Sequence, residues 1–143
     1  MDVTEPTAWS NVAFRSQNAC ANGQAQAATA MTHSPDVVIA AFGTNDIGVT
    51  TTAETVACYQ AIAAAIKPRP LWVALTPPTL PPAHDTTAEV DELNTALLAA
   101  FPGRTIDFHS GFTSEMYLDG IHLGPTGQEL RARRAVAALT GSR

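Results

Sequence analysis

The sequence has few charges, and they are predominantly acidic. Charged residues make up 15% of the chain, with 8 basic and 13 acidic side chains and a net charge of −5. The largest basic cluster, Arg131, Arg133 and Arg134, falls on a predicted terminal helix, where we expect it to form a solvated face. A groove that binds nucleic acid needs a concentrated positive surface, so we expect no nucleic-acid partner.

Long apolar runs are also missing. No stretch approaches the roughly 18 apolar residues that a transmembrane helix requires, so no membrane span is expected. Residues 1–6 lack both the basic region and the apolar core of a signal peptide. For the chain as given, the cytoplasm is the default location, and secretion stays open if the N-terminus is truncated.

Cysteine and metal-ligand patterns are sparse as well. Two cysteines, Cys20 and Cys58, are too few for a disulfide framework; they could form one disulfide or remain buried thiols. The remaining candidate ligands lack metal-site spacing such as His-x-x-x-His, so we predict no metal and no cofactor and interpret the histidines as surface residues. These candidates are His33, His84 and His109, with Asp36, Asp85 and Asp107 near them.

What the sequence does contain is a regular alternation of apolar segments. Residues 37–42 form a continuous apolar run between Pro35-Asp36 and Gly43, as expected of a strand buried on both faces. Further strands are predicted at residues 71–75 and 104–108, and helices at residues 24–31, 51–66, 86–101 and 126–139. A helix start near residues 5–9 and a short strand near 12–14 are also predicted.

Three sequence patterns predict capping boxes at helix starts: Thr51-x-x-Glu54, Thr86-x-x-Glu89 and Thr126-x-x-Glu129. Strands and helices alternate without an internal repeat or a linker. This alternation is typical of a doubly wound α/β layer sandwich, and we interpret residues 1–143 as a single domain. The proline-rich segment 76–82 is predicted to be a stiff loop at the rim of the active site, with a polyproline ligand as the alternative. Trp9 and Trp72 are expected to be packing residues, with a substrate platform as the alternative.

Two loops carry candidate chemistry. Gly43-Thr44-Asn45-Asp46 follows the first strand, and ligands of open α/β sheets bind beyond the carboxyl ends of strands. The alternative is a polar turn that caps the next helix. Asp119 precedes His122 by three residues before the last helix, which suits a carboxylate that orients a general base. The alternative here is a structural Asp–His hydrogen bond.

Taken together, the two loops resemble blocks three and five of the SGNH (GDSL-type) hydrolase family. The resemblance implies a flavodoxin-like three-layer α/β/α sandwich with a five-stranded parallel sheet. It implies acyl transfer through a serine, with His122 and Asp119 catalytic and Asn45 in the oxyanion hole. Asn18-x-Cys20-x-x-Gly23 looks like block two, whose Gly23 amide would be another oxyanion donor. The implied substrate is a small-molecule ester or an acylated carbohydrate.

The chain departs from this family at block one. The expected Gly-Asp-Ser and its central strand are not visible; residues 1–6 read Met-Asp-Val-Thr-Glu-Pro, which puts Asp2 at the nucleophile's position. Ser10, Ser16 and Ser34 lack the required context, so the nucleophile is unknown. We therefore interpret the domain as N-terminally incomplete. A catalytically silent binding domain is the alternative, and the oligomeric state stays open.

The resemblance yields three geometric expectations. Asn45 and His122 should line one cleft at the carboxyl edge of the sheet. Asp119 should lie within about 2.6–3.2 Å of a His122 ring nitrogen. Block two would put Cys20 near the sheet edge and Cys58 on the helix after block three, so we expect no disulfide between them.

Overall fold

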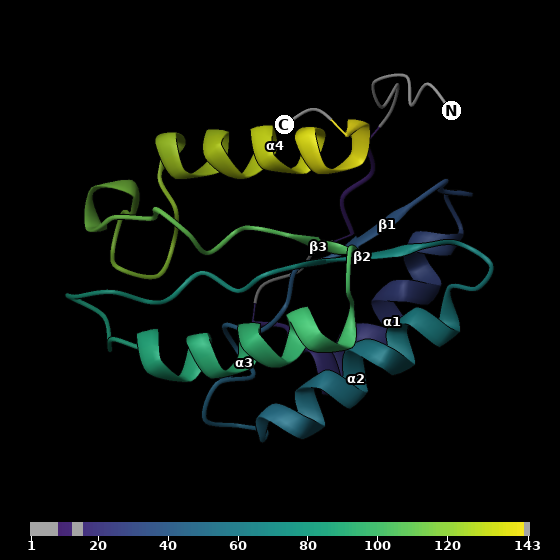
Figure 1. Ribbon diagram of the computed structural model, residues 1–143, viewed down its shortest axis with the longest axis horizontal. Coiled ribbons are helices and arrows are strands. Elements are labelled where there is room, and N and C mark those ends of the chain that lie inside the picture. Colours follow the sequence, from purple (N-terminus) through teal and green to yellow (C-terminus); the bar gives the residue numbers. More distant parts are fainter. Residues whose placement is uncertain (1–8, 13–15, 142–143) are drawn as a thin grey trace.

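The computed structural model describes residues 9–12 and 16–141. The helix predicted near residues 5–9 and the strand predicted near 12–14 fall largely outside this part. The described chain forms one parallel sheet in the order β1-β2-β3 (Figure 1). Its strands are β1 (Val38–Ala40), β2 (Leu71–Ala74) and β3 (Thr105–Ile106), each lying inside a predicted strand.

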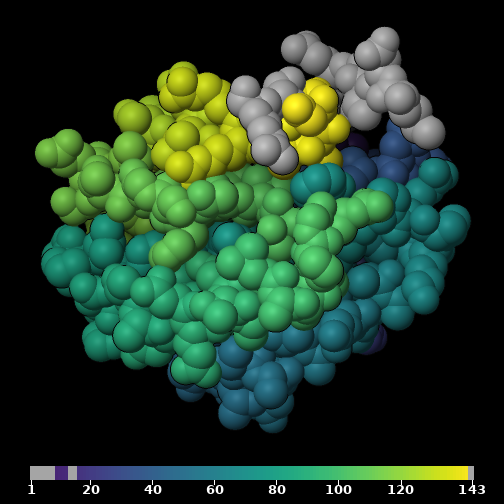
Figure 2. Space-filling view, in the orientation of Figure 1, coloured from purple at the N-terminus to yellow at the C-terminus, as the bar shows by residue number. Residues whose placement is uncertain are grey.

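Helices cover both faces of this sheet. Figure 1 shows α1 (Ala19–Met31), α2 (Thr52–Ala65) and α3 (Thr87–Ala100) on one side and α4 (Pro125–Thr140) on the other. Figure 2 shows the same arrangement in space-filling form, with α4 in yellow on the side opposite the blue of α2. The predicted α/β/α sandwich is confirmed. Three strands fit an incomplete flavodoxin-like sandwich, with β1 at one edge of the described sheet.

Of the three predicted capping boxes, only the first is formed. Thr51 and Glu54 satisfy each other's backbone amides at the start of α2. At α3 the prediction is wrong, because the Thr86 hydroxyl accepts the Thr79 N–H at 3.0 Å and no side-chain cap forms. At α4 it is also wrong, because the helix begins one residue earlier, at Pro125, whose fixed φ suits a first helical position.

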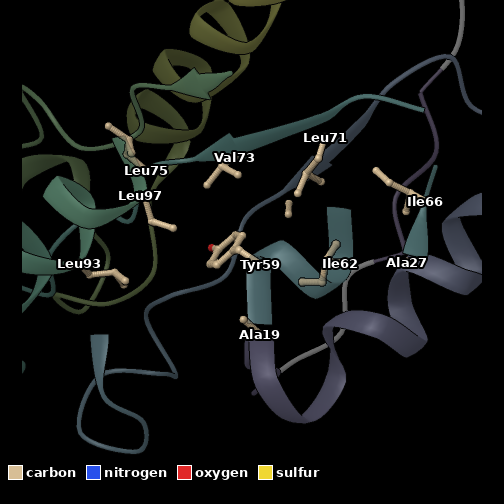
Figure 3. Packing of buried hydrophobic residues seen from close by; sticks show 11 residues of the cluster. Ala19, Ala27, Tyr59, Ile62, Ile66, Leu71, Val73, Leu75, Leu93 and Leu97 are labelled. Carbon is tan, nitrogen blue, oxygen red and sulfur yellow. The ribbon is translucent and has the colours of Figure 1, made fainter. Parts of the chain in front are cut away.

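The larger core lies between the sheet and the layer of α1, α2 and α3. Figure 3 shows side chains of α2, α3 and β2 gathered in one cluster, among them Tyr59, Leu97 and Val73, each 0% exposed. The Tyr59 hydroxyl accepts the Phe42 N–H at 3.0 Å, and burial raises the pKa of Tyr59. The buried apolar side chains of α2 and α3 thus face the sheet, where each large side chain contributes about 2 kcal/mol on burial.

A buried amide directs the chain after β2. Asn94 of α3 accepts the Thr76 N–H at 2.8 Å through its side-chain oxygen and donates to the Thr76 carbonyl at 2.9 Å. None of the strand pairings in the described chain includes Thr76, and the two hydrogen bonds with Asn94 satisfy its backbone instead. The segment that follows β2 is thereby fixed to α3.

The prediction of unpaired cysteines is wrong. Cys20 and Cys58 form a disulfide, with their Cα atoms 5.0 Å apart. Helix α1 begins at Ala19, earlier than predicted, so Cys20 lies in its first turn against α2 and not at the sheet edge. Gly23 permits this close packing: a Cβ there would lie 2.3 Å from the Ile62 Cδ1 atom.

Two further expectations need correction. Trp9 is 58% exposed and does not pack in the interior, whereas Trp72 is half-buried beneath Arg104. Of the three arginines expected on a solvated face, only Arg133 is exposed. Arg131 lies over the Phe108 ring at 4.7 Å, and Arg134 donates to the Asp107 carbonyl at 2.8 Å. Within residues 9–12 and 16–141, no helix combines the length and apolarity needed to cross a membrane.

We predict that replacing both cysteines, Cys20→Ser with Cys58→Ser, destabilises the fold by about 4 kcal/mol, because the bridge closes a long loop in the unfolded chain. The two residues are separated by 38 positions. Urea unfolding of the oxidised protein and the double variant measures the difference. Reduced wild type is the control and should unfold with the double variant; free thiols in the untreated protein would contradict the pairing.

Candidate active site

A cleft of about 180 Å³ opens at the carboxyl ends of all three strands. Residues that directly follow β1, β2 and β3 meet there, as parallel strands require, and the start of α4 closes one side. The lining residues are Ala41, Phe42, Thr44, Ala74, Leu75, Pro77, Phe108, Ile121, His122, Leu123, Gln128 and Arg131. Pro77 among them puts the proline-rich segment at the rim.

The turn after β1 is held by a buried carboxylate. Asp46 is 1% exposed and accepts N–H groups from Ala19 at 3.0 Å and from Gly43 at 3.0 Å. Burial raises the pKa of Asp46, while hydrogen bonds from the Ala19, Gly43 and Cys20 amides oppose that change. The carboxylate therefore ties the start of α1 to the turn that carries Thr44 and Asn45. Sequence analysis did not assign a role to Asp46.

Asn45 is exposed beside the cleft, and its side chain is not among the lining residues. Its amide donates to the Gln17 carbonyl at 3.0 Å. The neighbouring Thr44 does line the cleft, together with His122. The expectation that the side chains of Asn45 and His122 line one cleft is therefore not met, although the turn that carries Asn45 reaches the cleft through Thr44.

His122 is carried on a tight loop. Tyr117 and Leu123 form an isolated antiparallel bridge, and the Leu118 N–H donates to the His122 carbonyl at 2.7 Å. The Tyr117 hydroxyl donates to the Pro78 carbonyl at 2.6 Å, which fastens the base of the loop to the proline-rich segment. The loop tip is therefore held in place although its side chains face solvent.

Asp119 and His122 form the predicted pair. The Asp119 Oδ2 atom lies 2.7 Å from His122 Nδ1, and Oδ1 accepts the backbone N–H groups of His122 at 2.7 Å and Ile121 at 2.9 Å. These donors hold the pKa of Asp119 at about 2. The carboxylate is therefore ionised whenever the imidazole needs a partner at Nδ1, which leaves Nε2 to exchange protons.

Gly120 is the residue that lets this loop approach the proline-rich segment. It has φ of +81°, and a Cβ there would lie 2.0 Å from the Leu80 carbonyl oxygen. The Leu80 N–H in turn donates to the Gly120 carbonyl at 2.8 Å. A side chain at this position would push apart the two segments that position Asp119 and His122.

The structure does not bring Gly23 to the cleft. Gly23 lies inside α1, where a backbone N–H points to the carbonyl four residues earlier. Its assignment as an oxyanion donor is therefore corrected to a packing role against Ile62. The family resemblance misplaced it because α1 begins before Gly23 and not after it.

No serine lines the cleft. Ser10, Ser16 and Ser34 are all exposed, and the single hydroxyl among the lining residues belongs to Thr44. Within the described part of the chain, the nucleophile is thus still unassigned. No group of three potential metal ligands gathers among residues 9–12 and 16–141.

The remaining histidines are not among the residues that line the cleft. His33 and His84 are exposed, whereas His109 is half-buried, with its Nε2 atom 2.9 Å from an Asp91 carboxylate oxygen. His109 is therefore not a free surface residue. Sequence reasoning also missed Gln128 and Arg131, which line the cleft from one face of α4. Their spacing of three residues on a helix is the signal that could have found them.

Comparison with known proteins identifies the class. A model of the GDSL-like lipase/acylhydrolase family matches residues 4–130. The chain therefore belongs to this family, whose members hydrolyse esters. No curated protein matches the sequence.

Two solved structures share the fold. One is a carbohydrate esterase family 3 protein from Talaromyces cellulolyticus, with a TM-score of 0.73 and 21% identity. The other is a serine-to-alanine mutant of an acetyl esterase with an acetate ion, with a TM-score of 0.74 and 22% identity. Each comparison covers 87% of this chain and 67% of the other.

We predict that Gly120→Ala destabilises the protein by about 2 kcal/mol or more, because it adds a backbone clash to the strain of a positive φ. Gly48→Ala is the matched control: its φ is +77° and nothing lies within 4 Å of the added carbon. It should cost about 1 kcal/mol from strain alone. Chemical denaturation measures both, and equal losses would contradict the clash at Leu80.

We predict that the Asp119 carboxylate titrates with a midpoint of about 2, below its ordinary 3.8. Because the pKa is lowered in the folded state, the stabilisation is present above 3.8 and is lost as pH falls through about 2. Carboxyl carbon chemical shifts measure the midpoint. In His122→Ala it should rise only part of the way, since two backbone donors remain. A wild-type midpoint near 3.8 would contradict the geometry.

Proposed function

We propose that this chain hydrolyses an acyl ester of a carbohydrate through a serine, with His122 as general base and acid. The observation that carries the proposal is the Asp119–His122 pair at a cleft formed by the carboxyl ends of the strands. Oriented imidazoles of this kind contribute about 10²–10⁴-fold by proton transfer.

In the proposed reaction, a serine hydroxyl attacks the acyl carbon and its proton passes to His122 Nε2. Asp119 accepts the Nδ1 hydrogen bond and stabilises the imidazolium. The tetrahedral intermediate collapses, the C–O bond to the alcohol breaks, and His122 returns the proton to the leaving oxygen. Water then cleaves the acyl-serine with the same transfers, releasing a carboxylic acid and restoring the hydroxyl.

Asn45 is the proposed oxyanion donor. It lies directly after Thr44, which lines the cleft, and its side chain is exposed and tied by a single hydrogen bond to Gln17. Turning its amide toward the acyl oxygen would exchange that bond for one that forms in the transition state. A donor of this kind typically lowers the activation barrier by about 3 kcal/mol.

The substrate class follows from the small cleft and the neighbouring structures. A cleft of about 180 Å³ suits a short acyl group with part of a sugar. The neighbours with the same fold are a carbohydrate esterase and an acetyl esterase, which supports an acetylated carbohydrate as the substrate here. The Cys20–Cys58 disulfide further supports an oxidising compartment as the place of action, since cytosolic thiols are kept reduced.

One observation favours a second candidate. Among the described residues, none that lines the cleft is a serine, which suits a catalytically silent domain that binds an acylated carbohydrate without cleaving it. The two candidates share the cleft and differ in whether a serine reaches His122.

The deciding experiment is labelling by a fluorophosphonate probe, which reacts with activated serines. We predict no labelling of residues 1–143 alone, and labelling once an apolar strand ending in Gly-Asp-Ser precedes Val3. The extended chain should also hydrolyse p-nitrophenyl acetate, because only then is a nucleophile present.

His122→Ala in the extended chain should reduce both signals by about 10³-fold or more. His33→Ala is its control, since His33 is exposed and lies in the turn directly after α1, outside the cleft lining. An extended chain that folds but is never labelled would favour the silent binding domain. Labelling of Ser10 or Ser16 in residues 1–143 would show that the nucleophile lies elsewhere.

A further inference from the structure

Arg131 is the one permanently charged side chain among the residues that line the cleft. It projects from the second turn of α4 and lies with its guanidinium over the Phe108 ring, 4.7 Å from the ring centroid. Phe108 itself follows β3 and lines the same cleft. The stacking holds the planar group in a fixed orientation against the wall opposite the turn after β1.

Among the described residues, the charge of Arg131 is not paired with a carboxylate. In the described part of the chain, no carboxylate lies at ion-pair distance from it, and none of the cleft-lining residues is acidic. Burial lowers the pKa of Arg131, which reflects the partial loss of its hydration. A half-buried cation without an anion is costly, and an anionic ligand would offset that cost.

The two neighbouring arginines of α4, Arg133 and Arg134, both interact with carboxylates of the protein, in contrast to Arg131. Arg134 donates to the Asp107 carbonyl at 2.8 Å and lies 3.6 Å from its carboxylate. Arg133 is exposed and lies 3.7 Å from Glu129. Both have partners on the protein, whereas Arg131 faces the cleft that holds His122.

We propose that Arg131 binds a free carboxylate of the substrate, so that the cleft selects acylated sugars that carry an acid group, such as uronic acids acylated on a ring hydroxyl. The guanidinium fork matches a carboxylate with two parallel hydrogen bonds, whereas a neutral hydroxyl engages only one. The chain's net charge of −5 gives no general attraction for acidic ligands, so binding of an acidic sugar depends on a local cation.

This inference rests on the proposed function for its substrate class, but its test needs no hydrolysis. Amide chemical shifts of His122, Leu123 and Gln128 are followed while glucuronate or glucose is added to the folded protein. The two sugars share a ring and differ in a carboxylate against a hydroxymethyl group. Glucuronate should bind at least roughly tenfold more tightly, and added salt should weaken it.

Arg131→Gln should remove this preference, and Arg131→Lys should keep part of it, because the charge remains but the fork is lost. Arg133→Gln removes the same charge from an exposed site of the same helix and should leave the preference unchanged. If circular dichroism shows that Arg131→Gln does not fold, the glucuronate preference of Arg131→Lys is compared with that of the wild type instead.

Equal binding of glucose and glucuronate would overturn the inference, as would a preference that survives Arg131→Gln in the folded protein. Acetate is the third probe. If acetate binds through Arg131 while glucuronate shows no advantage over glucose, the arginine holds the acyl product and not the sugar's acid group. The two proposals can fail separately. If the extended chain is not labelled by the probe but the protein still prefers glucuronate to glucose, the hydrolysis proposal is rejected and the proposed binding specificity is supported.

Discussion

The buried carboxylate of Asp46 is the contact on which the arrangement of this molecule depends most. It joins the turn after β1 to the first amides of α1, two segments far apart in sequence. Once the start of α1 is fixed there, Cys20 faces Cys58 and Gly23 meets Ile62. The same turn presents Thr44 to the cleft. Three backbone donors offset the desolvation of a charge that would otherwise be expelled from the interior.

Other buried polar contacts fix the remaining walls of the cleft. Asn94 replaces a sheet partner for Thr76, and the Tyr59 hydroxyl satisfies the Phe42 amide as β1 ends. Each contact satisfies backbone where a strand stops and a functional segment begins. The strands are short, so side-chain hydrogen bonds satisfy the backbone groups that lie beyond the ends of the strand ladder. Rigid walls of this kind are what a site needs to place reacting groups reproducibly.

The Asp119–His122 pair lies at the exposed tip of the loop before α4. The His122 side chain is 72% exposed and that of Asp119 is 52% exposed, so solvent screens both. Their alignment comes from backbone donors and from the contact of Gly120 with Leu80. Arg131, in contrast, is partly shielded and stacked on Phe108. The cleft thus combines a solvent-facing imidazole with a shielded guanidinium.

The sequence by itself determined the features that depend on local order. The run at residues 37–42, the Thr51–Glu54 capping box and the Asp119–His122 pair each involve residues a few positions apart, so propensity and hydrogen bonding along the chain suffice. The tertiary structure decided the rest. The disulfide, the packing role of Gly23 and the place of Arg131 in the cleft all depend on which helices lie together. The Thr86 hydroxyl was diverted from its helix by Thr79. Such contacts join segments that are distant in sequence, so they cannot be predicted from the spacing of residues along the chain.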